Sequence, residues 1–136
     1  MEVLKEEKEM PLVVVVQGQS ILRIWMEAAL SNCFRVCVFS GPEDALAFVR
    51  STHSLDVLVT DLDLGLSALG GCNIARDVRE RFPESLIFVF SNGDANDHRL
   101  VILRGMSGIK LLFKPFGAFS LVRQVKAALA SAKPSK

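Results

Sequence analysis

The sequence lacks a long apolar run and a strong excess of one charge. Leu12–Val16, the first of its short apolar runs, is far below the roughly 20 residues that a membrane helix needs. Met1–Met10 is acidic and charged, which is unlike a signal peptide. The formal net charge is only +1 and the basic residues are scattered, so no basic patch indicates a nucleic-acid or membrane partner. We therefore expect a cytoplasmic protein that binds neither nucleic acid nor membrane.

The cysteines and glycines exclude further classes of protein. Cys33, Cys37 and Cys72 are odd in number and contain no CxxC pair, so they indicate neither a disulfide framework nor a structural zinc site. We interpret them as small core residues, since unpaired cysteine is often buried. The glycines form neither GxGxxG nor GxxxxGK followed by Ser or Thr, so a small nucleotide- or flavin-binding enzyme is the least favoured function.

Short apolar runs alternate with amphipathic segments along the whole chain. Five short apolar runs predict strands, and the first of them, a continuous β-branched run, is typical of a strand covered on both faces by helices. The runs lie at Leu12–Val16, Val36–Phe39, Asp56–Asp61, Leu86–Ser91 and Ile109–Phe113. Apolar residues three and four positions apart follow each run and predict a helix after every strand.

The spacing of apolar residues also predicts which side of each helix is apolar. After Ser20, a plausible N-cap, the first helix is expected to have an apolar face made of Ile21, Ile24, Trp25 and Ala28. The apolar residues of the fourth helix are expected to include Leu100, Val101 and Leu103. The apolar face of the fifth is assigned in the same way to Phe119, Leu121, Val122, Val125, Ala128 and Leu129.

This alternation predicts an α/β fold, a doubly wound five-stranded parallel sheet, because parallel strands need right-handed helical crossovers. We divide the chain into a charged N-terminal extension (1–10), one domain (11–131) and a C-terminal tail (132–136). In such sheets, functional groups gather beyond the carboxyl ends of the strands. Those ends hold Gln17, Asp61, Ser91 and Lys114.

From about residue 12 to residue 130, the chain resembles the receiver domain of two-component response regulators. Asp56-Val-Leu-Val-Thr-Asp61 is similar to the strand that ends in the phosphoacceptor aspartate. Phe88-Val-Phe-Ser91 is similar to the strand that ends in the switch Ser or Thr. Leu112-Phe-Lys114-Pro115-Phe116 resembles the family's Lys-Pro-Phe and is the most specific match. The resemblance implies the flavodoxin-like (βα)5 receiver fold.

The resemblance also implies a function. The chain would be a stand-alone receiver, and not an enzyme, that accepts a phosphoryl group on Asp61 from a sensor histidine kinase or phosphotransfer protein. It would signal by protein-protein contact. A carboxylate can attack phosphohistidine and form an acyl phosphate, and the ammonium of Lys114 and the hydroxyl of Ser91 would stabilise the added charge. Receivers commonly pair through their fourth and fifth helices, so a homodimer is compatible with the resemblance.

Two positions depart from the family pattern. Ordinary receivers help to hold Mg²⁺ with two adjacent acidic residues after the first strand, where this chain has Gln17-Gly18. We expect weakened Mg²⁺ binding, with Asp61, Asp63 and the neutral amide of Gln17 as candidate ligands; a loop-capping role for Asp63 is an equal alternative. The second departure is Leu111, at the position of the switch ring. A phosphorylation-independent pseudo-receiver interaction module is therefore the alternative function.

Overall fold

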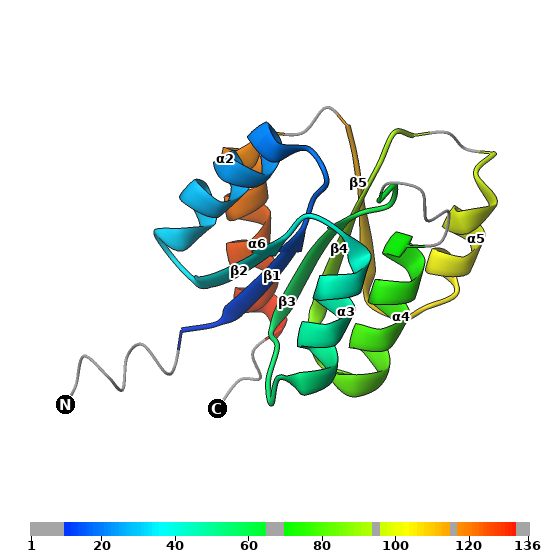
Figure 1. Ribbon diagram of the computed structural model, residues 1–136, viewed down its shortest axis with the longest axis horizontal. Helices are drawn as coiled ribbons and strands as arrows, with labels where there is room; N and C mark the ends of the chain where they lie inside the picture. The colour runs from blue at the N-terminus through cyan, green and yellow to red at the C-terminus, as the bar shows by residue number, and fades with distance from the viewer. Residues whose placement is uncertain (1–9, 65–69, 94–95, 115–116, 133–136) are drawn as a thin grey trace.

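Parallel strands form a single sheet in the computed structural model, which describes residues 10–64, 70–93, 96–114 and 117–132 (Figure 1). The strands are β1 (Leu12–Val16), β2 (Arg35–Phe39), β3 (Val57–Asp61), β4 (Leu86–Ser91) and β5 (Ile109–Phe113). Their order is β2-β1-β3-β4-β5, and every neighbouring pair is parallel. The predicted five-stranded parallel sheet is confirmed.

Helices cover both faces of the sheet. They are α2 (Ser20–Ser31), α3 (Pro42–Ser51), α4 (Gly70–Arg81), α5 (His98–Arg104) and α6 (Ala118–Ala132). Figure 1 shows α2 and α6 on one face and α3, α4 and α5 on the other. Among the described residues, no helix has the length and apolar content needed to cross a membrane.

The core consists of two apolar clusters, one on each face of the sheet. Val14 and Val16 point into the cluster beneath α3, α4 and α5, whereas Val13 and Val15 point into the cluster beneath α2 and α6. All of β1 is buried because successive side chains of a strand point to opposite faces and both faces are covered. This explains why β1 has a continuous apolar sequence.

The apolar face predicted for the first helix is wrong. Ile21, Ile24 and Trp25 are exposed, and the buried residues of α2 are Met26 and Leu30. Apolar residues surround most of this helix, so their spacing does not single out one face. Ser20 is also the first helical residue instead of the N-cap, which is Gln19 and makes no side-chain capping hydrogen bond.

Val101 and Phe119 are exposed as well, which corrects their assignment to the apolar faces of α5 and α6. Leu100 and Leu103 of α5 and Leu121 and Val125 of α6 are buried, as the sequence predicts. Each residue turns the helix by about 100°, so a residue one or two positions from a buried one can face away from the sheet.

The ends of the chain and the cysteines complete the comparison with the sequence. α6 reaches Ala132, the first residue of the predicted tail. Residues 1–9 and 133–136 lie outside the described residues, so the predicted extension and tail stay predictions. The cysteines are unpaired, and Cys72 is buried whereas Cys33 and Cys37 are half-buried.

Gly71 allows α4 to approach the carboxyl end of β3 closely. A Cβ atom added at Gly71 would lie 2.5 Å from the carbonyl oxygen of Asp61 and 2.8 Å from the Cα of Leu62. These are backbone atoms that no rotamer change can move, so only glycine allows this approach. The contact fixes the backbone on which the Asp61 side chain stands.

We expect Gly71→Ala to lower the free energy of unfolding by about 1–3 kcal/mol, because the added methyl group must displace packed backbone. Urea unfolding followed by circular dichroism measures this change. Gly18→Ala is the matched control, since a Cβ there would meet no atom closer than 3.8 Å. An equal decrease in the free energy of unfolding of the two variants would contradict the close approach of α4 to β3.

Candidate functional site

Asp61 and Lys114 meet at the carboxyl edge of the sheet, as the sequence predicts. Asp61 ends β3, and Lys114 follows β5, with β4 between the two strands. The Nζ atom of Lys114 donates a hydrogen bond to Oδ2 of Asp61 at 3.0 Å. The backbone N–H of Lys114 donates to the carbonyl of Ser91, which extends the β4–β5 pairing and positions the lysine over β4.

The Asp61 carboxylate is buried and both of its oxygens have partners. Its side chain is 4% exposed, so an unpaired charge here would be strongly destabilising. Besides the Lys114 contact, Oδ1 accepts a long 3.3 Å hydrogen bond from the backbone N–H of Asp63. The N–H of Leu62 donates to the carbonyl of Phe90 and continues the pairing of β3 with β4 beyond Asp61. The carboxylate is thus held on a fixed backbone beside an ammonium group.

Ser91 takes the turn role that its sequence context allows. It is fully buried, and its Oγ accepts a 3.1 Å hydrogen bond from the N–H of Gly93, which has a φ of 89°. The positive φ explains the glycine. A switch role for Ser91 stays a prediction. Leu111 is half-buried and packs against the core cluster beneath α3, α4 and α5.

Gln17 closes the turn that leads into α2. Its side chain is buried, and Oε1 accepts a 3.0 Å hydrogen bond from the N–H of Gln19. Its backbone carbonyl accepts a 2.8 Å hydrogen bond from Nη1 of Arg23. The Gln17 side chain, at a position that is acidic in the family pattern, therefore stabilises this turn. The neighbouring Gly18 is exposed.

Arg99 is a charged residue of this edge that the sequence analysis missed. Its Nη2 atom lies 2.8 Å from Oδ1 of Asp63 and 2.6 Å from Oδ2 of Asp97, and its Nε donates to Oδ1 of Asp97 at 2.9 Å. Asp97 is the N-cap of α5 and accepts the backbone N–H of Arg99. Arg99 therefore links the loop after β3 to the start of α5.

One feature of the sequence indicates that Arg99 has acidic partners. A cation in the first turn of a helix is unfavourable beside the positive end of the helix dipole, so Arg99 there indicates an acidic partner. The hydrogen bond from the Arg99 side chain holds the pKa of Asp97 at about 2, below its ordinary 3.8. The hydrogen bonds to Asp97 and Asp63 raise the pKa of Arg99 further above its ordinary value.

The carboxylates at this edge do not fit the Mg²⁺ site that the resemblance implies. Mg²⁺ prefers an octahedron of oxygen ligands and is usually held by one or two carboxylates with water. Asp61 contacts Lys114, Asp63 contacts Arg99, and the Gln17 amide oxygen contacts a backbone N–H. Within the described part of the chain, no three His, Cys, Asp or Glu side chains form a group that could hold a metal ion.

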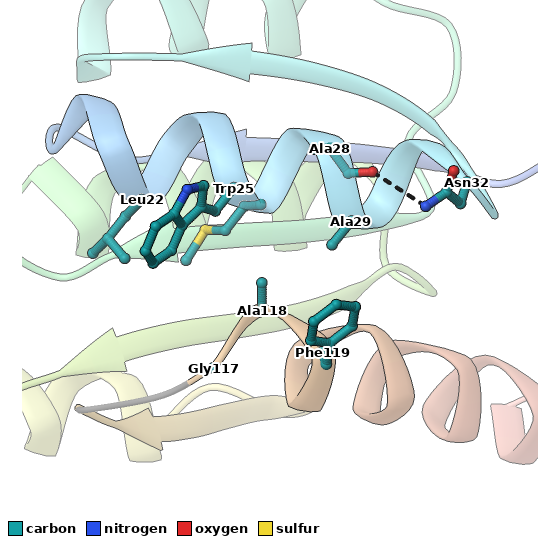
Figure 2. Close-up of a pocket in the computed structure, with 9 residues that line it drawn as sticks. Leu22, Trp25, Ala28, Ala29, Asn32, Gly117, Ala118 and Phe119 are labelled. Carbon is teal, nitrogen blue, oxygen red and sulfur yellow. Dashed lines mark hydrogen bonds between the residues drawn. The ribbon is translucent and has the colours of Figure 1, made fainter.

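A pocket of about 590 Å³ lies between α2 and α6 (Figure 2). Its lining residues are Leu22, Trp25, Met26, Ala28, Ala29, Asn32, Gly117, Ala118 and Phe119. Figure 2 shows Leu22 and Trp25 of α2 across from Ala118 and Phe119 at the start of α6. Trp25 is 60% exposed and Phe119 is 82% exposed. None of these side chains titrates, so the pocket suits apolar contact and not chemistry.

Several solved structures with the same fold are receiver domains. A response regulator receiver protein from Sinorhizobium medicae is 24% identical with a TM-score of 0.79, covering 93% of this chain and 99% of that one. Response regulator DrrB of Thermotoga maritima is 23% identical with a TM-score of 0.75, covering 91% of this chain and 54% of that one.

A third solved structure contains the metal that this chain's residues do not fit. It is the receiver domain of a sensor histidine kinase from Pseudomonas aeruginosa, with a magnesium ion coordinated in its active-site cleft. It is 18% identical with a TM-score of 0.72, covering 89% of this chain and 98% of that one. At these identities the likeness concerns the fold, and the chain has the fold of response regulator receiver domains. The sequence matches no family model and no curated protein.

Asp97→Asn removes the charge that binds Arg99 but keeps a side chain that can cap α5. We expect a loss of about 1 kcal/mol in the free energy of unfolding near neutral pH. Because the folded-state pKa of Asp97 is about 2, below the ordinary 3.8, its contribution is complete above that ordinary value and is lost as the pH falls through about 2.

Urea unfolding of both proteins at about pH 7 and about pH 3 checks this dependence. The difference between wild type and Asp97→Asn should be smaller at the lower pH. A difference that stays constant across this range would show that the Asp97 charge contributes nothing through Arg99.

Proposed function

We propose that this chain is a receiver that accepts a phosphoryl group on Asp61 from a sensor histidine kinase or phosphotransfer protein and signals by protein-protein contact. The observation that carries the proposal is the 3.0 Å contact between Lys114 and Asp61 at the carboxyl edge of a receiver fold. In such a fold this edge is where functional groups gather. The proposal makes the chain a signalling module and not an enzyme.

The arrangement of partners around Asp61 supports this chemistry. Among the described residues, Oδ1 is held only by the long hydrogen bond from the N–H of Asp63, so it is the freer oxygen to attack the phosphorus of a phosphohistidine. A phosphorus–oxygen bond then forms as the phosphorus–nitrogen bond to the imidazole breaks. The Lys114 ammonium already lies against Oδ2 and is within reach of the oxygens of a new phosphoryl group, where charge-assisted hydrogen bonds are strong.

Signalling would proceed without the ring that the family pattern places at Leu111. Ser91 would have to leave the N–H of Gly93 before its hydroxyl could donate to a phosphoryl oxygen. The free energy available for switching equals the difference between the phosphoryl group's interactions in the two states. The response would therefore pass through the backbone and the loop at Gly93 instead of a paired rotamer change.

Two observations favour a second function, a pseudo-receiver that binds a partner without phosphorylation. The carboxylates that would hold Mg²⁺ are either replaced, at Gln17-Gly18, or already paired, at Asp63. The pocket between α2 and α6 also exposes apolar rings, Trp25 and Phe119, which is common at protein-binding surfaces. This function requires the fold but no reaction at Asp61.

Phosphorylation of the intact chain distinguishes the two functions. We expect intact mass spectrometry to detect one added phosphoryl group after incubation with acetyl phosphate or a phosphorylated histidine kinase, with Mg²⁺ present and absent in parallel samples. The adduct should be absent in Asp61→Asn and retained in Asp44→Asn, which changes an exposed aspartate of α3. No adduct from either donor would overturn the proposal and favour the pseudo-receiver.

Lys114→Met tests the role of the ammonium. We expect labelling of Asp61 to be about 10- to 100-fold slower, because a charge-assisted hydrogen bond to the incoming phosphoryl group is lost. Lys110→Met is the matched control, since Lys110 is an exposed residue of the same strand. Circular dichroism at the labelling temperature shows whether each variant is folded. Equal labelling rates for folded Lys114→Met and wild type would remove Lys114 from the chemistry.

A further inference from the structure

We infer that Arg99 excludes divalent metal from the Asp61 site by occupying the carboxylate of Asp63, so that protein cations replace the metal there. This inference goes beyond phosphorylation and holds whether or not Asp61 accepts a phosphoryl group. Asp63 is the remaining carboxylate next to Asp61 in the loop after β3 within the described residues. Its availability therefore decides whether a metal can bind beside Asp61.

The oxygens near Asp61 are already engaged by positive or N–H groups. Oδ2 of Asp61 accepts from the Lys114 ammonium, and Oδ1 accepts from the N–H of Asp63. Oδ1 of Asp63 lies 2.8 Å from the Arg99 guanidinium. A divalent cation that enters must weaken these contacts and approach two positive side chains, Lys114 and Arg99, which repel it.

Arg99 is held in place by its other contacts. Its side chain is only 14% exposed, and its planar fork makes three hydrogen bonds to Asp97, from Nε at 2.9 Å and 3.2 Å and from Nη2 at 2.6 Å. A guanidinium can bind two carboxylates in this way, whereas a lysine ammonium is a single point charge. Turning Arg99 away from Asp63 would strain the contact with the N-cap of α5. The guanidinium therefore behaves as a fixed cation and not as a mobile surface charge.

The contact between Arg99 and Asp63 is also weak enough to be tested. The Asp63 side chain is 49% exposed, and ion pairs at such positions are screened by water and salt. Removing Arg99 should therefore raise metal affinity by a measurable but modest factor, about tenfold. The inference also requires that the metal bound after Arg99 is removed is held by Asp63. Replacing both residues should therefore abolish the gain in metal affinity.

Mg²⁺ titration of the ¹⁵N-labelled chain, followed by amide chemical shifts, tests the inference. Line broadening by Mn²⁺ locates any bound ion. We expect no saturable shift at the amides of residues 61–63 in wild type up to Mg²⁺ concentrations on the order of 10 mM. Arg99→Gln should bind Mg²⁺ at these amides about tenfold more tightly than wild type, and Arg99→Gln combined with Asp63→Asn should lose that gain.

Two further variants keep the result interpretable. Arg104→Gln changes an exposed arginine in the last turn of the same helix and should bind no more Mg²⁺ than wild type. If the amide spectrum shows that Arg99→Gln unfolds α5, then Arg99→Lys decides, because it keeps a charge near Asp97 but cannot bridge both carboxylates. A gain in Mg²⁺ affinity in Arg99→Lys supports the inference.

Two results would overturn it. Saturable Mg²⁺ binding by wild type that disappears in Asp63→Asn would mean that Asp63 already serves as a ligand despite Arg99. A folded Arg99→Gln, or a folded Arg99→Lys in its place, that binds Mg²⁺ no better than wild type would mean that Arg99 does not exclude the metal. Neither result depends on labelling of Asp61, so failure of this inference is distinguishable from failure of the proposed function.

Discussion

The buried carboxylate of Asp61 imposes the constraint on which the rest of the site depends. A carboxylate that is 4% exposed is stable only beside a cation or several hydrogen-bond donors. Lys114 meets this need from the far side of β4, and it does so only because β3, β4 and β5 are parallel. The pairing of Asp61 with Phe90 and of Ser91 with Phe113 brings the three strand ends to one edge. The sheet topology and the ion pair therefore depend on each other.

The strands were predictable and the buried face of α2 was not, for the same physical reason. A strand covered on both faces needs apolar residues at every position, so Leu12–Val16 could be read directly from its composition. A helix buries only one stripe, and α2 has apolar residues around most of its surface. Whether Met26 or Trp25 packs on the sheet depends on how α2 and α6 meet, which spacing within α2 does not encode.

The two ion pairs of the site also differ in how far the sequence predicts them. Asp61 and Lys114 could be placed together from the sequence because a parallel sheet brings the carboxyl ends of its strands to one edge. The contact of Arg99 with Asp63 instead depends on the paths of two loops, and hydrophobic periodicity carries no information about those paths. The unusual position of a cation in the first turn of α5 was the one local sign of it. The pocket between α2 and α6 was missed because its residues were assigned to the core.

The described carboxylates at this edge contact cations of the protein itself. Asp61 is matched by Lys114, and Arg99 is shared by Asp63 and Asp97. A phosphoryl group on Asp61, as proposed, would carry about −2 charges at neutral pH in place of the −1 of the free carboxylate, without a metal ion to offset the increase. Arg99 would then have a new anion to interact with, in competition with the half-exposed Asp63. Because Arg99 stands in the first turn of α5, a change in its contacts would act on that helix, and the proposed signal would then reach the surface without a ring at Leu111.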